Sequence, residues 1–296
     1  MRKRRPRSRA VLAVVAAAVL GVAGCDAVGG DSGPAATRRS SPSPTPTWDR
    51  SPDSLAAVGD SITRGFDACS VLSDCPEVSW ATGSDPKVKS LAVRLLGTDG
   101  AAKRSWNYAV TGARMADLPG QMAKAVPRKP ELVAVMAGAN DACTSSVSTM
   151  TSVARFRASF EEAMDTLRAS LPKAQVYVSS VPDLKRLWSQ GRGNPLGKQV
   201  WKLGICPSML GDADALDASA TSRRAKVQKR VVAYNEVLRE VCAKDERCRF
   251  DGDAVFDYRF GTKQLSHWDW FHPSTNGQAR LAEIAYRTVT ARKPTA

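Results

Sequence analysis

Short apolar runs that stop abruptly at a glycine are the feature that most constrains this chain. Residues 55–58 are followed at once by a Gly-Asp-Ser turn at 59–61, and residues 132–137 are followed by Gly138. Runs of four to eight apolar residues bounded by turn residues are typical of buried strands. Helical patterns separate these runs along the chain, so the sequence predicts parallel strands connected by helices.

The other predicted elements continue this alternation. Further strands are expected at residues 106–110 and 175–180. Helices are expected at residues 88–96, 153–170, 222–243 and 275–292. Together they predict a three-layer α/β/α sandwich with a central, mostly parallel sheet. In such folds, binding sites gather at the carboxyl ends of the strands.

Residues 188–218 interrupt the pattern. They are rich in Gly, Pro, Asp and Ser and show no clear hydrophobic period. We therefore interpret them as a long surface insertion within one domain, which covers residues 51–296 and is long enough to enclose a sizeable core.

The N-terminus has the composition of an export signal. A Lys/Arg cluster at residues 2–9 runs into a small-apolar stretch at residues 10–24, which is shorter than the roughly 20 residues of a membrane-spanning helix. We expect residues 1–24 to be a signal peptide. The sequence ending in Cys25 resembles a bacterial lipobox, in which the Cys becomes lipidated, although an ordinary secretory signal with an incidental Cys is the alternative.

A disordered tether is expected after Cys25, because residues 25–50 are rich in Pro, Ser and Thr and cannot bury apolar surface. These features predict an extracellular protein, tethered to the outer face of the cytoplasmic membrane as a lipoprotein. The formal charge of +14 includes six Lys/Arg in residues 1–24, and subtracting them leaves +8. Such a basic surface suits anionic lipid or cell-wall polymer. Nucleic acid is not expected, since no basic-aromatic stripe or zinc spacing is present.

Six of the seven cysteines form an even set once Cys25 is set aside. In an exported chain such a set indicates disulfides, and the absence of Cys-x-x-Cys and the presence of only two His argue against a metal site. Fifteen pairings are formally open for six cysteines. The short spacings favour Cys69–Cys75 and Cys242–Cys248, which leaves Cys143 with Cys206, and this last pair would hold the insertion beside the strand ends.

Four polar stretches fall after expected strands or before the last helix. They are residues 57–63 (AVGDSIT), 107–113 (NYAVTGA), 137–141 (AGAND) and 269–273 (DWFHP). Each motif alone is common, but the four in this order resemble the conserved blocks of the SGNH (GDSL) hydrolase family, over residues 55–286. The residues within these blocks are most similar to those of the phospholipase B-like and actinobacterial esterase/lipase branches.

The resemblance implies a flavodoxin-like SGNH-hydrolase fold and a serine ester hydrolase. It makes Ser61 the nucleophile, His272 its base and Asp269 the acid that orients the imidazole. The backbone N–H groups of Ser61 and Gly112 and the side-chain amide of Asn140 would form the oxyanion hole. No metal or organic cofactor is implied.

Each of these residues also has a structural interpretation. Ser61 suits a helix cap, Gly112 a left-handed turn, and Asn140 a turn stabilised by its own side chain. We expect Asp60 and Asp141 to anchor loops rather than to take part in chemistry.

Three functions remain open from the sequence. The first is hydrolysis of acyl-lipid or simple carboxylic esters through an acyl-enzyme. The second is removal of O-acetyl groups from cell-wall or environmental polysaccharide, and the third is a non-catalytic lipoprotein that binds a ligand. An α/β-hydrolase elbow is not indicated, because Thr63 stands where its second Gly would be. His267, the other histidine, lacks the matching block.

Overall fold

The computed structural model describes residues 48–293. The predicted signal peptide, Cys25 and nearly all of the predicted tether therefore lie outside the described residues. Within residues 48–293, no helix combines the length and apolar character that crossing a membrane requires.

Five parallel strands form one sheet in the order β2-β1-β3-β4-β5. The strands are β1 (Leu55–Gly59), β2 (Ser105–Asn107), β3 (Leu132–Met136), β4 (Gln175–Val178) and β5 (Cys248–Phe250). This order is the flavodoxin-like one, in which the strand connections reverse direction between β1 and β3. The predicted parallel sheet is confirmed, and its central strands β1 and β3 are the two apolar runs that end at a glycine.

Helices and short 3-10 turns connect the strands. The α-helices are α1 (Ser61–Arg64), α2 (Leu91–Arg104), α3 (Leu118–Ala125), α4 (Ala139–Ala142), α5 (Val153–Ser170), α6 (Leu184–Gly191), α7 (Pro195–Trp201), α8 (Pro207–Leu210), α9 (Ala218–Cys242), α10 (Ala254–Asp257) and α11 (Thr275–Thr290). The 3-10 turns are η1 (Pro76–Val78), η2 (Met115–Asp117), η3 (Val126–Arg128) and η4 (Thr262–Gln264).

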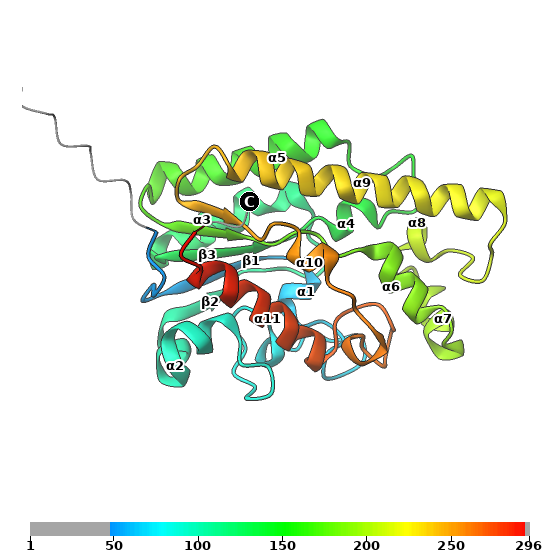
Figure 1. Cartoon of the computed structure of the whole chain (residues 1–296), viewed down its shortest axis with the longest axis horizontal. Coiled ribbons are helices and arrows are strands. Elements are labelled where there is room, and N and C mark those ends of the chain that lie inside the picture. Colours follow the sequence, from blue (N-terminus) through cyan, green and yellow to red (C-terminus); the bar gives the residue numbers. More distant parts are fainter. Residues whose placement is uncertain (1–47, 294–296) are drawn as a thin grey trace, which may run out of the picture. The chain divides into compact units, whose positions relative to one another are not determined.

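The long helices cover both faces of the sheet, as the sandwich prediction requires. Helices α3, α5 and α9 lie on one face, and α2 and α11 lie on the other (Figure 1). Ser152 and Ser274 begin α5 and α11 as N-caps, each accepting a backbone N–H bond 3.2 Å long. A Ser cap satisfies one of the otherwise unpaired N–H groups at a helix start, so these helices begin where the sequence predicts.

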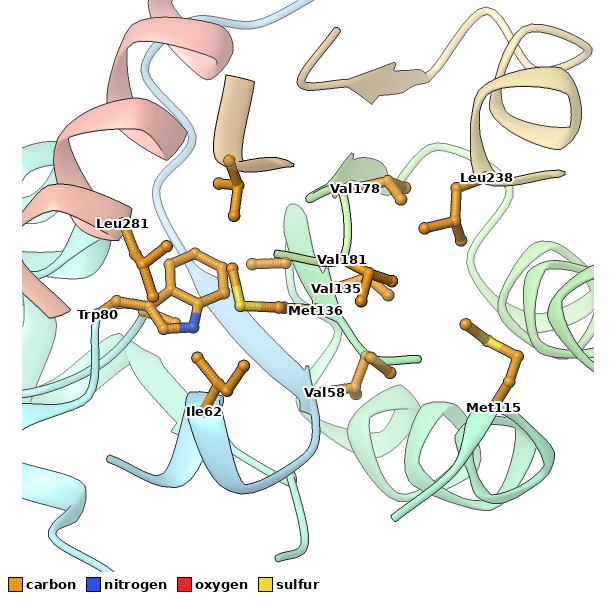
Figure 2. Packing of buried hydrophobic residues seen from close by; sticks show 14 of the residues in the cluster. Val58, Ile62, Trp80, Met115, Val135, Met136, Val178, Val181, Leu238 and Leu281 are labelled. Atoms are coloured by element: carbon orange, nitrogen blue, oxygen red, sulfur yellow. The ribbon is translucent and has the colours of Figure 1, made fainter. Parts of the chain in front are cut away.

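The core lies on both sides of the sheet because successive strand side chains point to opposite faces. Figure 2 shows Val135 directed toward Val58 and Val181, whereas its neighbour Met136 is directed toward Trp80. All five side chains are at most 1% exposed. Each aliphatic side chain of this kind stabilises the fold by about 1.5–3 kcal/mol.

Several predicted elements differ from the structure at their bounds, and the helix expected at 222–243 begins four residues earlier, as α9 (Ala218–Cys242). The helix expected at 88–96 begins after Ser90 and continues to Arg104, with a break at Gly97, whose φ is 70°. The strand expected at 106–110 is assigned only to Ser105–Asn107. Backbone bonds from Tyr108 and Val110 nevertheless reach Ala57 (2.8 Å) and Gly59 (3.1 Å), so the segment still follows β1.

Residues 188–218, interpreted from the sequence as a long surface insertion without a clear hydrophobic period, contain helices and buried side chains. The segment holds the end of α6 and all of α7 and α8, and Trp201 and Met209 are buried. Asn194 caps α7 and a proline opens both α7 and α8, which are helix-start signals. Helices of seven and four residues are too short to display a hydrophobic period, so the pattern could not reveal them.

Candidate active site

The end of β1 places Ser61 at the carboxyl edge of the sheet. Gly59 has φ 147°, and a Cβ there would lie 2.0 Å from the carbonyl oxygen of Met136, so only glycine fits. Asp60 then caps α1, its Oδ1 accepting the N–H of Ile62 at 3.0 Å. Ser61 is therefore the first residue of a helix that begins immediately after a buried strand.

Ser61, His272 and Asp269 form one hydrogen-bonded chain. Ser61 Oγ lies 3.0 Å from His272 Nε2, although the two residues are 211 positions apart. On the other side of the ring, His272 Nδ1 bonds to Asp269 Oδ2. Oδ1 of Asp269 accepts the backbone N–H groups of Phe271 (2.9 Å) and His272 (3.0 Å), which fixes the carboxylate.

Charge around the imidazole makes it a stronger base. Burial by itself lowers the pKa of His272, but the charge and hydrogen bond of Asp269 and the charges of Asp67 and Asp60 outweigh burial and raise it. Burial would raise the pKa of Asp269, yet His272 and the two backbone N–H bonds lower it. The pair therefore favours a proton on the imidazole and an ionised Asp269.

Gly112 and Asn140 line the same cavity as Ser61 and His272. Gly112 has φ 85°, the left-handed conformation that glycine adopts readily. Asn140 Nδ2 donates to the carbonyl of Ala113 at 3.0 Å, which holds the amide against the Gly112 turn. An amide nitrogen carries two N–H groups, so this bond leaves the second one for a substrate oxygen.

The rest of the cavity wall is mainly apolar. The cavity has a volume of about 170 Å³. Its large apolar lining residues come from α1, α6 and three loops, and are Ile62, Phe66, Leu184, Leu187, Ile205 and Phe271. A carbonyl group beside Ser61 would thus have an apolar surface next to it.

The six cysteines form three disulfides, in the pairing favoured by their spacing. These are Cys69–Cys75, Cys143–Cys206 and Cys242–Cys248. Cys143 and Cys206 both line the cavity, and their Cα atoms are 4.2 Å apart. The bond therefore joins the end of α4 to the start of α8 within the cavity wall, as expected for an insertion held beside the strand ends.

The two aspartates expected to anchor loops do so. Asp60 caps α1, and Asp141 Oδ2 accepts the N–H of Met115 at 2.8 Å. His267 has no place among the cavity-lining residues, and its ring packs on Trp268 at 4.2 Å between centroids.

Sequence reasoning missed residues that support Ser61 from a distance. Gln121 clamps the end of β1, accepting the N–H of Gly59 at 2.7 Å and donating to its carbonyl at 3.0 Å. Gln278 of α11 donates to the carbonyl of Ile62 at 2.9 Å and so fixes the position of α1 relative to α11. Both glutamines are buried, but a helical Gln carries no local pattern that would identify its partner 62 or 216 residues away.

Asp67, Asp269 and His272 are the described residues near the site that could hold a cation, since their potential ligand atoms lie within 4.8 Å of one another. Asp269 and His272, however, use these atoms for hydrogen bonds to each other and to the backbone. Cys69, Cys75 and Glu77 form a second such group, but both of its sulfur atoms are in a disulfide.

Comparison with known proteins gives the same family as the motifs. The family model of the GDSL-like lipase/acylhydrolases matches residues 55–285. Membrane-associated phospholipase B1 of Mus musculus is 26% identical over 214 residues, which is 60% of this chain and only 14% of that much longer protein.

Two solved structures are similar in fold. An alpha/beta hydrolase from the metagenome of Lake Arreo is 18% identical, with a TM-score of 0.49 over 81% of this chain and 95% of that one. The extracellular lipase of Streptomyces rimosus is also 18% identical, with a TM-score of 0.42 over 78% of this chain and 99% of that one. Because the family model matches most of its length, the chain belongs to the GDSL-like lipase/acylhydrolase family.

Proposed function

We propose that this hydrolase cleaves esters through a covalent acyl-enzyme on Ser61, with His272 as general base and Asp269 as the orienting acid. The observation that carries the proposal is the chain of contacts from Ser61 Oγ to His272 Nε2 (3.0 Å) and from His272 Nδ1 to Asp269. A serine hydroxyl has a high pKa and attacks a carbonyl only when a base removes its proton, and this contact supplies the base.

The steps follow from that geometry. Ser61 Oγ attacks the carbonyl carbon while its proton passes to His272 Nε2, and the carbonyl oxygen becomes an oxyanion. The N–H groups of Ser61, Gly112 and Asn140 stabilise this charge. The C–O bond to the alcohol then breaks as His272 returns the proton to the departing oxygen. Water then gives a proton to the same imidazole and attacks the acyl carbon. As the bond between that carbon and Ser61 Oγ breaks, His272 passes the proton to Oγ, which releases the acid and free Ser61.

An ester with an apolar acyl group longer than acetyl is the substrate that we propose. Leu184, Leu187 and Ile205 give the cavity an apolar side that an acetyl group would not fill. The volume of about 170 Å³ is below the roughly 300–1,000 Å³ of pockets that enclose drug-sized ligands, so a long chain would have to extend out of the mouth. Similarity to a phospholipase B1 supports acyl-lipid as one such substrate.

Replacement of the nucleophile tests the chemistry. We expect Ser61→Ala to lower kcat for p-nitrophenyl butyrate by at least about 10⁴-fold and to abolish labelling by a fluorophosphonate. Ser189→Ala, which changes an exposed serine on α6, is the matched control and should keep both properties. Unchanged turnover in Ser61→Ala would refute the assignment. An unmodified protein that neither reacts with the probe nor cleaves esters would instead support a non-catalytic binding lipoprotein.

Acyl-length preference separates the two enzymatic alternatives. We expect kcat/KM to rise from p-nitrophenyl acetate to the butyrate and hexanoate esters, because added methylene groups bury apolar area worth about 0.8 kcal/mol each. Activity confined to acetyl esters, with release of acetate from acetylated polysaccharide, would favour the acetylesterase instead.

The proposed location is the outer face of the cytoplasmic membrane, with Cys25 as lipid anchor. The supporting observations are the basic and apolar stretches of residues 1–24, the lipobox-like sequence before Cys25, and three disulfides, which persist in oxidising compartments. Expression of Cys25→Ser in a bacterial host should move the protein from the membrane fraction to the medium. Equal membrane association of both forms would argue against the anchor.

A further inference from the structure

Asp67 is a buried carboxylate beside the active site that the proposed mechanism does not use. It lies three residues after the end of α1 and is 1% exposed. Its carboxylate, that of Asp269 and the ring of His272 have ligand-type atoms that all lie within 4.8 Å of one another. Two acids and one imidazole thus share a small enclosed volume.

A loop closed by a disulfide holds Asp67 in this position. Its Oδ1 accepts the N–H of Leu72, and its own N–H donates to the carbonyl of Ser73 at 3.0 Å. Its carbonyl oxygen accepts the hydroxyl of Ser266 at 2.6 Å, and the Cys69–Cys75 disulfide closes the same loop. These bonds keep Asp67 at φ 57°, a left-handed conformation that a non-glycine residue keeps only when its surroundings impose it.

One oxygen of this carboxylate is unpaired. Asp67 Oδ2 is buried and has no hydrogen-bond partner among the described atoms, whereas Oδ1 is bonded to Leu72. A buried, unpaired carboxylate oxygen is costly, and binding a proton lowers that cost. The ionised carboxylate of Asp269 has a ligand-type oxygen within 4.8 Å and could accept a hydrogen bond from that proton.

We propose that Asp67 is a positioning residue that tunes the Asp269–His272 pair through the proton on its Oδ2. With the proton bound, Asp67 is neutral and can donate to the Asp269 carboxylate, which weakens the hold of Asp269 on the imidazolium. With the proton lost, a second negative charge faces His272 and favours the imidazolium that forms during catalysis. The inference rests on the proposed function, because it concerns the base of that reaction.

The charges around the site agree with this role. Burial raises the pKa of Asp67 to about 6, with the charge of Asp269 as the next cause. Ionised Asp67 in turn raises the pKa of His272. The other titratable group facing His272 is Asp60, at the start of α1, whose pKa burial raises to about 7. Arg64 is nearby in the chain, but it pairs with Asp74 at 3.0 Å on the outer side of the loop.

Asp67→Asn tests the proposal, because it imitates the protonated acid. The amide oxygen can keep the bond to the N–H of Leu72, and the amide N–H₂ replaces the proton directed at Asp269. We expect the acid limb of kcat/KM to move about one pH unit lower, as for a charge removed 4–6 Å from the base. We therefore expect kcat/KM of Asp67→Asn, divided by that of the unmodified enzyme, to be about tenfold higher on the acid limb than on the alkaline plateau.

Asp99→Asn removes the same charge from an exposed site on α2 and should leave the limb in place. An unmoved limb in Asp67→Asn, or a shift to higher pH, would overturn the proposal. A merely structural role would lower activity equally at every pH, so a uniform loss would also overturn it.

A second measurement needs neither activity nor a variant at position 67. In Ser61→Ala, the ring resonances of His272 can be followed by NMR from pH 4 to 9, with His267 as internal reference. We expect a step from the ring itself and a separate step from Asp67 at about pH 6, below any step that Asp60 adds at about pH 7. A His272 ring that lacks the step at about pH 6 would contradict the proposal while leaving the role of Ser61 to its own test.

Discussion

The two sides of the active-site cavity are built in different ways. On one side, Ser61, Gly112 and Asn140 follow β1, the β2 segment and β3, and the sheet fixes their backbone. On the other side, Leu187 and Ile205 belong to residues 184–210, which contain α6, α7 and α8 beyond the strand ends (Figure 1). We call these the sheet side and the helical side.

The difference separates chemistry from selectivity. All groups that we assign to attack and to oxyanion stabilisation come from the sheet side and from the loop before α11, where rigid backbone preorganises them. The helical side contributes apolar surface and the Cys143–Cys206 bond. Changes on the sheet side should therefore alter kcat, whereas changes on the helical side should alter stability and acyl preference.

Removal of the Cys143–Cys206 bond should give the largest effect on the helical side. The bond spans 63 positions, and closing a loop of that size restricts the unfolded chain by about 4 kcal/mol, so Cys143→Ser with Cys206→Ser should lower the free energy of unfolding by about that amount. Denaturant unfolding measures the loss. The preference for butyrate and hexanoate over acetate should also weaken, because the cavity wall is no longer held in place.

Cys69→Ser with Cys75→Ser is the matched control for that experiment. Its bond spans six positions and should contribute only about 2 kcal/mol by the same loop argument. Equal losses for the two pairs would show that loop length does not govern their contributions. An unchanged acyl preference without Cys143–Cys206 would remove the helical side from selectivity.

On the sheet side, Asn140→Ala should lower kcat by about 10²–10³-fold with a small change in KM. The reason is that an oxyanion donor acts mainly in the transition state, where the charge develops. Leu187→Ala on the helical side should show the opposite pattern, with KM for butyrate raised and kcat nearly kept. Steady-state kinetics of both variants would contradict the division if Asn140→Ala changed only KM.

Much of the sheet side could be predicted from the sequence, because its signals are local. The ends of β1 and β3 are marked by an apolar run, a glycine and a polar residue within nine positions, as at Ser61 and Asn140. Strand β5, with Arg249 between Cys248 and Phe250, has no such run and was not predicted. Parallel strands then bring these ends to one edge, whatever the distance along the chain.

The helical side and the supporting residues could not be predicted, because their partners are remote. Helices α7 and α8 are too short to show a period, and Trp201 is buried only through contacts made in the folded chain. Nothing in the sequence around Asp67 reveals that Asp269 lies beside it in the fold. The sequence therefore carries more information about the groups that we propose for attack than about those that we propose to tune them.

The pH dependence of activity should not depend on the helical side. Because the pKa of His272 is raised, kcat/KM should fall tenfold per pH unit on an acid limb centred above pH 6.5, the ordinary value for histidine. Protonated His272 cannot accept the proton of Ser61, so activity is lost as pH falls. The groups with the largest influence, Asp269, Asp67 and Asp60, all lie outside α6–α8. Leu187→Ala should keep the same limb, and a limb centred at or below 6.5 would be inconsistent with the contacts around the ring.

One hydrogen bond joins the helical side to Asp269, and its removal should have the smallest effect of the changes considered. Trp201 Nε1 of α7 donates to the carbonyl of Asp269 at 2.6 Å. Trp201→Phe keeps most of the packing but removes this bond, so we expect a loss of about 1 kcal/mol in the free energy of unfolding. If the bond also holds the Asp269 carboxylate in position, kcat should fall a few-fold with KM unchanged.

Trp188→Phe provides the matched comparison for Trp201→Phe. Trp188 Nε1 makes a similar bond, 3.1 Å long, to the carbonyl of Ala213, which follows α8, rather than to Asp269. Both variants should therefore unfold at similarly lowered denaturant concentrations, but only Trp201→Phe should lower kcat. Equal kcat values in the two variants would confine α7 to a structural role, because a group that steadies the acid must affect the step in which His272 takes the proton.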